Sequence, residues 1–293
     1  MAKKILKALG HSEDTKLLMI HADDAGLSHS ENIATIQALE SGSINSYSTM
    51  VPCPWFQEMA QFSKQNPQFD NGIHLTLTCE WETYRFGPVL PIKEVPSLVD
   101  ENGHFYKKRE LLKEHALSED VRKELQAQIE KALAFGLEPT HLDSHMYSVA
   151  SRADFLDIYK DLGRIYDLPV FLNRQLVNEI GLNANDCLGE NDLVADYLFL
   201  GNIVDFKNGK LAEYYDNVLD NLSSGFNVLI LHPAFDNLEM QGITVNHPNF
   251  GSEWRQTDYD YFTSEKCKSK LMANDIKLVT WKEIGEALKK LHT

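Results

Sequence analysis

The sequence predicts an α/β protein, a deformed (β/α) barrel of the TIM-like type, and three observations lead to this prediction. Short apolar runs alternate with segments of helical periodicity, which is typical of parallel sheets covered by helices. The chain has 293 residues, and single barrels occupy ~200 to 250 residues or more. Polar residues also gather where several predicted strands end. An open doubly wound sheet is the alternative, but no GxGxxG motif follows the first strand.

The strands are predicted from short apolar runs. The run KLLMIHA at residues 16–22 comes first and indicates a buried strand. Residues 193–200 fit a helix and a strand equally well. The predicted strands are residues 16–22, 46–51, 72–77, 140–144, 168–172, 226–231 and 276–281.

The helices are predicted from apolar residues at helical spacing and from end signals. Ser28 and Glu31 have the spacing of a capping box, so we expect a helix that begins there and ends at Gly42. The other predicted helices carry Trp55, Met59 and Phe62 before Pro67, carry Val121, Leu125, Ile129 and Leu133 before Gly136, and span residues 152–166, 211–223 and 282–291.

We expect one domain over residues 1–293. Residues 1–15 are expected to form an extended or helical tail. Residues 80–110 lack clean periodicity, and the Pro-rich part of this stretch is expected to cross one end of the domain. Long loops of this kind are often lids over a binding site.

Composition and charge indicate which kinds of molecule this protein is expected to bind. A formal net charge of -15 argues against nucleic acid, whose phosphates require a basic face. No stretch approaches the ~18 apolar residues of a membrane span. Four cysteines without a CxxC pair indicate reduced thiols. We therefore expect a cytoplasmic protein that binds neither nucleic acid nor membrane and acts on a small neutral or cationic substrate; apolar and aromatic surface loops make a homodimer reasonable.

Candidate site residues stand at the ends of four predicted strands, where a barrel would bring them together. Asp23 and Asp24 follow the first strand; the alternative explanation is an acid pair at a helix N-terminus. Since adjacent residues leaving a strand point in different directions, one carboxylate can bind metal while the other faces the substrate as a base. The third strand carries His74 in GIHLTL, where a lone histidine is more often a core residue. His232 precedes Pro233 and is interpreted either as a structural hydrogen-bonding group or as a general acid that titrates near neutrality.

The segment His141-Leu142-Asp143-Ser144-His145 carries the strongest signal. In an extended chain His141, Asp143 and His145 share one face, whereas in a helix the two histidines would stand at i and i+4. Pro139 favours the strand. Two histidines with one aspartate suit zinc or another divalent ion and leave positions open for water. From spacing alone either histidine, and either aspartate of the earlier pair, can be the ligand.

These segments resemble the YdjC-like carbohydrate deacetylase family. The matching segments occur in the family's order and are LLMIHADDAGLS, INSYSTMV, GIHLTLT, PTHLDSH, FLNRQ and VLILHPAF. The resemblance implies a deformed barrel related distantly to polysaccharide deacetylases, with one divalent metal ion, zinc or magnesium.

The resemblance also implies a role for each residue. Metal ligands map onto Asp24, His74 and His145, and the catalytic base maps onto Asp23. The histidine of HPAF maps onto His232 and would protonate the leaving group. A family arginine maps onto Arg174, which would orient Asp23 or contact substrate. His141 and Asp143 would then support the ligands.

Two departures from the family pattern concern the pocket wall. Ala25 stands where the family often has phenylalanine, and Met146 and Tyr147 replace a further histidine. The expected activity is removal of an acetyl group from an N-acetylated amino sugar or short chitooligosaccharide. The alternatives are a metal-dependent hydrolase of another bond, such as a phosphoester, and a sugar-binding barrel without catalysis.

Overall fold

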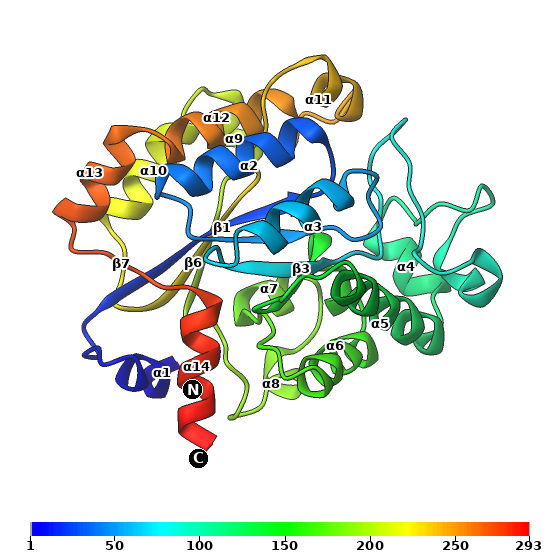
Figure 1. Ribbon diagram of the computed structural model, residues 1–293, viewed down its shortest axis with the longest axis horizontal. Helices are drawn as coiled ribbons and strands as arrows, with labels where there is room; N and C mark the ends of the chain where they lie inside the picture. Colours follow the sequence, from blue (N-terminus) through cyan, green and yellow to red (C-terminus); the bar gives the residue numbers. More distant parts are fainter. Residues whose placement is uncertain (1, 293) are drawn as a thin grey trace.

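A computed structural model describes residues 2–292 and confirms the α/β class. Within these residues one parallel sheet has the strand order β4-β3-β2-β1-β6-β5, and β7 pairs with β1 (Figure 1). Residues 193–200, which fitted a helix or a strand, contribute strand β5. The strands are β1 Lys16–Ala25, β2 Ser46–Thr49, β3 Asn71–Leu75, β4 Leu142–Ser144, β5 Tyr197–Leu200, β6 Gly225–Leu231 and β7 Lys277–Leu278.

The two ends of this strand order, β4 and β5, are joined by residues 169–173. The amide of Phe171 donates to the carbonyl of Leu142, and the amide of Ala195, just ahead of β5, donates to the carbonyl of Leu172, both at 2.9 Å. Isolated bridges of this kind, rather than a continuous ladder, connect the two strands. The sheet is therefore a deformed barrel, as the sequence predicts.

Helices cover the outside of the sheet on both sides (Figure 1). Two apolar clusters lie between the helices and the sheet. The first includes residues of α2, α10, α12 and α13, and the second includes residues of α1, α5, α6 and α14. The helices are α1 Ala2–Ala8, α2 His29–Ser41, α3 Phe56–Gln65, α4 Arg109–His115, α5 Ser118–Ala134, α6 Ala153–Ile165, α7 Arg174–Glu179, α8 Ala184–Cys187, α9 Ile203–Lys207, α10 Leu211–Asp220, α11 Leu238–Ile243, α12 Ser252–Phe262, α13 Glu265–Ala273 and α14 Trp281–His292, with 3₁₀ turns at Ile92–Glu94, Pro96–Leu98 and His145–Ala150.

Side chains along β1 point alternately to the two faces of the sheet, and this determines which of them face the barrel interior. Leu18 and Ile20 belong to the cluster beneath α2 and α10, whereas Leu17 and Met19 belong to the other cluster. Because side chains alternate across a strand, His21 continues the face of Leu17 and Met19. The interior face of the barrel thus becomes polar toward the carboxyl end of β1.

Two predicted strands differ from the structure. Residues 168–172 make one isolated bridge instead of a ladder, because Pro169 has no amide hydrogen to donate. The strand expected at 276–281 is limited to β7, since Trp281 already begins α14. The Asp70 carboxylate accepts hydrogen bonds from the amides of Trp281 and Lys282, each at 2.9 Å, and so stabilises the start of that helix.

The capping box predicted for α2 is half correct. The Ser28 hydroxyl accepts a hydrogen bond from the amide of Glu31 at 3.0 Å, and Gly42 ends the helix in the left-handed conformation, with φ 81°. The Glu31 carboxylate does not complete the box but pairs with Arg255 on α12. Glu31 is therefore part of a buried ion pair.

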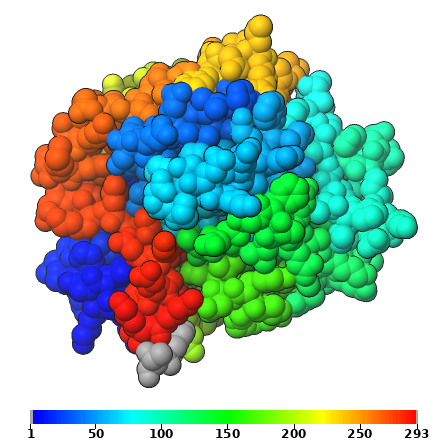
Figure 2. Space-filling model, viewed as in Figure 1, coloured from blue at the N-terminus to red at the C-terminus, as the bar shows by residue number. Residues whose placement is uncertain are grey.

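The N-terminal tail and the segment after β3 also have defined structure. Residues 2–8 of the tail form α1, which lies beside α14 (Figure 1). Residues 80–108, here called the lid segment, contain two 3₁₀ turns and no longer helix. With α4 they form a lobe at one side of the molecule (Figure 2). None of the helices in residues 2–292 has the length and apolarity needed to cross a bilayer.

Candidate metal and catalytic site

A cavity of about 370 Å³ lies at the carboxyl ends of the barrel strands. Its lining includes all five residues for which the sequence predicts metal binding or proton transfer: Asp23, Asp24, His74, His145 and His232. They come from the ends of β1, β3, β4 and β6. Parallel strands of a barrel place their carboxyl ends on one side, which is why positions more than 200 residues apart meet here.

A bulge at the end of β1 brings both aspartates into the same cavity. The pairing of β1 with β2 is irregular between Ala22 and Ala25, and Asp24 has a φ of 66°. Aspartate is among the few residue types that enter the left-handed region readily. Both carboxylates line the cavity, and the expectation that one binds metal while the other faces the substrate stays a prediction.

Asp24, His74 and His145 each offer one ligand atom, and these atoms lie within 4.8 Å of one another. Oδ1 of Asp24 is 3.3 Å from Nε2 of His74 and 2.9 Å from Nδ1 of His145. Nε2 of His74 is buried and has no hydrogen-bond partner in the protein. A buried imidazole nitrogen without a partner, facing a carboxylate and a second histidine, is what a divalent-ion site of the His₂Asp type provides. The residues present fit such an ion.

Asp143 orients His74 from the opposite side of its ring. Nδ1 of His74 lies 2.8 Å from Oδ1 of Asp143 and 3.0 Å from the hydroxyl of Ser48. A carboxylate that accepts the proton of one ring nitrogen leaves the other nitrogen free to bind metal. The role that the sequence predicts for Asp143, support of a metal ligand, stays a prediction. Asp143 also forms an alternative grouping with Asp23 and His74, whose atoms lie within the same 4.8 Å limit.

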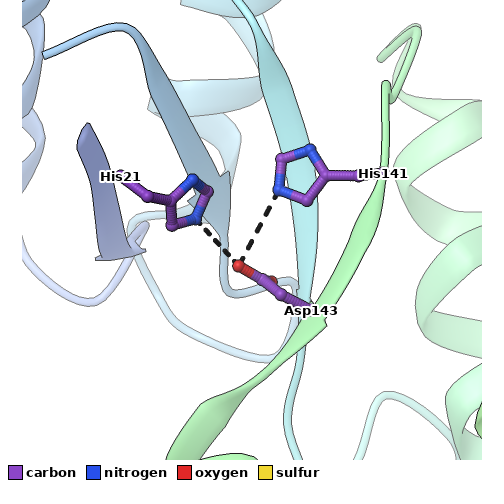
Figure 3. Close-up of side chains that lie close together, drawn as sticks. All are labelled: His21, His141 and Asp143. Carbon is purple, nitrogen blue, oxygen red and sulfur yellow. Dashed lines mark hydrogen bonds and ion pairs between the residues drawn. The ribbon is translucent and has the colours of Figure 1, made fainter. Parts of the chain in front are cut away.

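His21, His141 and Asp143 form a buried network in which both histidines face the Asp143 carboxylate (Figure 3). Nε2 of His21 is 2.8 Å from Oδ2 of Asp143 and 3.2 Å from Oδ1 of Asp23, so this histidine connects the two carboxylates. His141 Nε2 is 3.8 Å from Asp143, and its ring stacks on Trp281. His141 thus supports Asp143 and not a ligand directly.

Gly72 on β3 makes room for His141. A Cβ atom at this position would lie 2.3 Å from Cε1 of the His141 ring. The glycine in GIHLTL therefore serves close packing between β3 and the residue that precedes β4.

Arg255 on α12 is a site residue that sequence reasoning missed. It is 1 % exposed, donates to Oδ2 of Asp24 at 2.8 Å, and pairs with Glu31. Burial alone would raise the pKa of Asp24, but His145, His74 and Arg255 outweigh it and hold the pKa well below its usual range. Asp24 is therefore ionised, as a metal ligand must be. No motif marked Arg255, because it lies inside a helix with mixed polarity.

Glu80 is a second residue that the sequence did not single out. It follows β3, lines the cavity, and places Oε2 2.9 Å from Nε2 of His145. Burial tends to raise its pKa, but the neighbouring His145 lowers it below the ordinary value. A buried, ionised carboxylate from the lid segment thus faces a predicted metal ligand.

His232 follows β6 and stands across the cavity from β3. Its Nε2 is 3.9 Å from Oδ2 of Asp23 and 4.0 Å from Oδ2 of Asp24, while its backbone amide donates to Asp258. Burial lowers the pKa of His232 to about 4. The expectation of a group that titrates near neutrality is therefore wrong for the free site, where the ring is neutral.

Arg174 lies away from the aspartates. It begins α7, is exposed, and donates to the side chain of Asn185 at 2.7 Å. It is not among the residues that line the cavity. Arg174 therefore does not orient Asp23, which contacts His21, and the buried arginine of the site, Arg255, pairs with Asp24 instead. The contact of Arg174 with substrate stays a prediction.

The rest of the cavity wall is largely apolar. Met146 and Tyr147, which depart from the family pattern, are part of this wall and have positive φ values of 52° and 50°. Ala25 is buried and does not reach the cavity. Residues of β5 and β6, α7 and α14 complete the apolar part: Leu176, Leu198, Leu200, Val228, Ile230 and Trp281.

A parallel barrel that presents two histidines and two aspartates in a cavity of about 370 Å³ defines a site of the metal-dependent hydrolase class. Residues 17–273 match the sequence profile of the family described as YdjC-like protein, and the chain belongs to this family.

Relatives and a solved structure support the assignment over nearly the full length. A carbohydrate deacetylase of Thermus thermophilus is 31% identical over 277 residues, which cover 93% of this chain and 95% of the relative. A chitooligosaccharide deacetylase of Serratia marcescens is 27% identical over 281 residues, with 92% and 99% covered. A crystal structure from Enterococcus faecalis, of a protein proposed to cleave cellobiose phosphate, is similar with a TM-score of 0.75 and 26% identity, and 92% and 99% of the two chains are covered.

Proposed function

We propose that this protein removes the acetyl group from an N-acetylated amino sugar or a short chitooligosaccharide. The observation that carries the proposal is the placement of Asp24, His74 and His145 around one point, with Asp23 on the adjacent side of the same cavity. Relatives named carbohydrate deacetylase and chitooligosaccharide deacetylase support the choice of bond and of substrate class.

Asp24, His74 and His145 would hold one divalent ion. When bound, the ion supplies Lewis-acid chemistry: it withdraws electron density from the acetyl carbonyl and makes water more acidic. Two imidazoles and one carboxylate favour zinc over magnesium, since magnesium prefers oxygen ligands and keeps several waters. We therefore propose zinc.

Asp23 acts as the base. Its Oδ1 is buried 3.2 Å from Nε2 of His21, and because 12% of the side chain is exposed, the carboxylate can contact a water molecule in the cavity. It takes a proton while the water oxygen bonds to the acetyl carbon. His232, whose Nε2 lies 3.9 Å from Oδ2 of Asp23, would take up that proton and pass it to the amide nitrogen as the C–N bond breaks. The products are acetate and the free amine of the sugar.

The remaining groups of the site hold these residues in place. Arg255 fixes the carboxylate of Asp24, and His21 fixes that of Asp23. The apolar wall excludes water from the reacting atoms, which strengthens electrostatic interactions in the cavity. A sugar ring has apolar faces that can pack on Phe250 and Trp281, both of which line the cavity.

Acetate release tests the proposal. Purified protein is stripped of metal, reloaded with zinc or magnesium, and supplied with N-acetylglucosamine, N,N′-diacetylchitobiose, N,N′,N″-triacetylchitotriose and a panel of phosphoesters. We expect acetate from at least one acetylated sugar, loss of activity with chelator, and stronger recovery with zinc. Phosphate release without acetate release would replace deacetylation by phosphoester hydrolysis. Absence of bindable metal would favour a sugar-binding barrel. The cytoplasmic location and the homodimer stay predictions from the sequence.

A further inference from the structure

We propose that Glu80 orients His145 for metal binding and thereby makes the lid segment a determinant of metal affinity. The inference rests on the proposed function only in taking Asp24, His74 and His145 as the residues that hold the ion. Glu80 belongs to none of the motifs on which the family resemblance depends, and it enters the site from outside the strands of the barrel.

The His145 ring contacts a carboxylate at each nitrogen. Nδ1 is 2.9 Å from Oδ1 of Asp24, and Nε2 is 2.9 Å from Oε2 of Glu80. A neutral imidazole carries one proton, and the nitrogen that donates it cannot bind metal. If the proton rests on Nε2 and is donated to Glu80, the lone pair of Nδ1 is directed toward Asp24. His145 would then bind the ion through Nδ1.

His74 also directs one ring nitrogen to a supporting carboxylate and the other to Asp24, but its two nitrogens have the opposite roles to those in His145. Its Nδ1 contacts Asp143 at 2.8 Å, and its partnerless Nε2 faces Asp24 at 3.3 Å. Each histidine therefore has one nitrogen toward Asp24 and the other on a supporting carboxylate. The two supporting carboxylates differ in origin, because Asp143 belongs to β4 whereas Glu80 belongs to the lid segment.

The chain that follows Glu80 is held against the barrel. The Glu80 side chain is 11% exposed, against 4% for its partner His145. The next residue, Trp81, is fully buried, and Arg255 lies over its ring at 5.5 Å. Tyr84 donates from its hydroxyl to the carbonyl of Leu27 at 2.6 Å. These contacts fix the start of the lid segment against the barrel, so the Glu80 carboxylate is a built part of the site and not a mobile surface acid.

The test compares zinc affinities. Dissociation constants are measured by competition with a chromophoric chelator for the wild type, Glu80→Gln, Glu80→Ala and the control Glu82→Gln. Glu82 is exposed, lies two residues further along the same segment, and contacts Asn246 instead of a ligand. Supporting carboxylates of metal-bound histidines contribute about 10- to 100-fold in affinity. We expect a loss of that size in both Glu80 variants and a change within about twofold in Glu82→Gln.

Two further readouts separate orientation of the ligand from general stability. Thermal unfolding of the metal-free proteins shows whether the variants are folded, and a purely structural role would lower that stability and leave zinc affinity unchanged. Histidine ¹⁵N NMR of the zinc-loaded wild type should show His145 bound through Nδ1 and protonated at Nε2. Binding through Nε2, or unchanged affinity in both Glu80 variants, overturns this inference alone. Absence of zinc binding by the wild type overturns the proposed function with it.

Discussion

The guanidinium of Arg255 on α12 lies 2.8 Å from Oδ2 of Asp24 at the end of β1, although 231 positions separate the two residues. The same guanidinium pairs with Glu31, whose pKa is raised by burial, so one buried cation contacts two buried carboxyl groups. The pair joins the outer helix layer to the cavity. Its contribution to stability can be measured.

Replacing Arg255 by methionine should cost about 3 to 5 kcal/mol of unfolding free energy, because two carboxyl groups would remain buried without their cation. Urea denaturation at pH 7 measures the loss. Arg164 is a suitable control, since it is largely exposed and pairs with Asp161 at the surface; its methionine variant should change stability by less than about 1 kcal/mol. Similar losses for both variants would contradict the buried role of Arg255.

Asp23→Asn should retain metal but lose about 10²- to 10⁴-fold in kcat for acetate release, because the isosteric amide cannot accept the proton from water. Asp24→Asn serves as the comparison and should lose metal as well. Metal content by mass spectrometry and acetate release are measured on the same samples. If Asp23→Asn instead loses its metal, the alternative grouping of Asp23, His74 and Asp143 holds the ion.

Gly72→Ala should destabilise the protein by about 1 to 3 kcal/mol, the usual range for a group forced into a close-packed interior. The added Cβ would overlap the His141 ring and press it toward Asp143. Gly242→Ala is the matched control: Gly242 lies in α11 with no heavy atom within 4 Å of the added Cβ. That variant should be neutral or slightly more stable, because alanine favours the helix. Thermal unfolding of the two variants distinguishes these outcomes.

Asp258 should make stability depend on pH. Burial raises the pKa of its carboxyl from 3.8 to about 7, against the opposing effects of its hydrogen bonds from Tyr215 and the His232 amide and of the Arg255 charge. Between these values the folded protein keeps a proton that the unfolded chain releases. The contribution of Asp258 is therefore complete below pH 4 and is lost as the pH rises through 7, by about 4 kcal/mol.

The variant Asp258→Asn removes this proton equilibrium. Relative to wild type, its unfolding free energy should rise between pH 4 and pH 8, because the asparagine has no proton to lose. Denaturation of both proteins at four pH values measures how the difference between their unfolding free energies depends on pH. A difference that does not vary with pH would show that Asp258 titrates in the folded protein as it does in the unfolded chain.

The sequence allowed the fold class and the strand-end residues to be predicted for one physical reason: both depend on local pattern. The apolar run at 16–22 and the spacing in HLDSH are visible within a few residues. Asp24, His74 and His145 then meet because parallel strands bring their carboxyl ends together. Residues 168–172 show the limit of such patterns. Their apolar composition predicts a strand, but Pro169 cannot donate a hydrogen bond and the segment makes only an isolated bridge.

The other site residues could not be predicted because their roles depend on long-range packing. Glu80 stands in a segment without periodicity, and Arg255 stands in a helix whose polar residues resemble those of any surface helix. Glu31 has the spacing of a capping box, yet its carboxylate is used by Arg255. Arg174 shows the reverse case, in which a recognisable motif residue lies on the surface. Only the three-dimensional arrangement distinguishes these arginines.

The backbone at Asp24 restricts which amino acids this position can hold. Its φ of 66° is tolerated at small cost by glycine, asparagine and aspartate, and poorly by bulky or branched residues. The proposed ligand role requires an oxygen donor, which excludes glycine, and the ion pair with Arg255 requires a negative charge, which excludes asparagine. The backbone conformation, the need for an oxygen donor and the need for a negative charge therefore together leave only aspartate at position 24. Mutational scanning should find position 24 the least tolerant of the barrel, less tolerant than Asp23, whose φ is not positive.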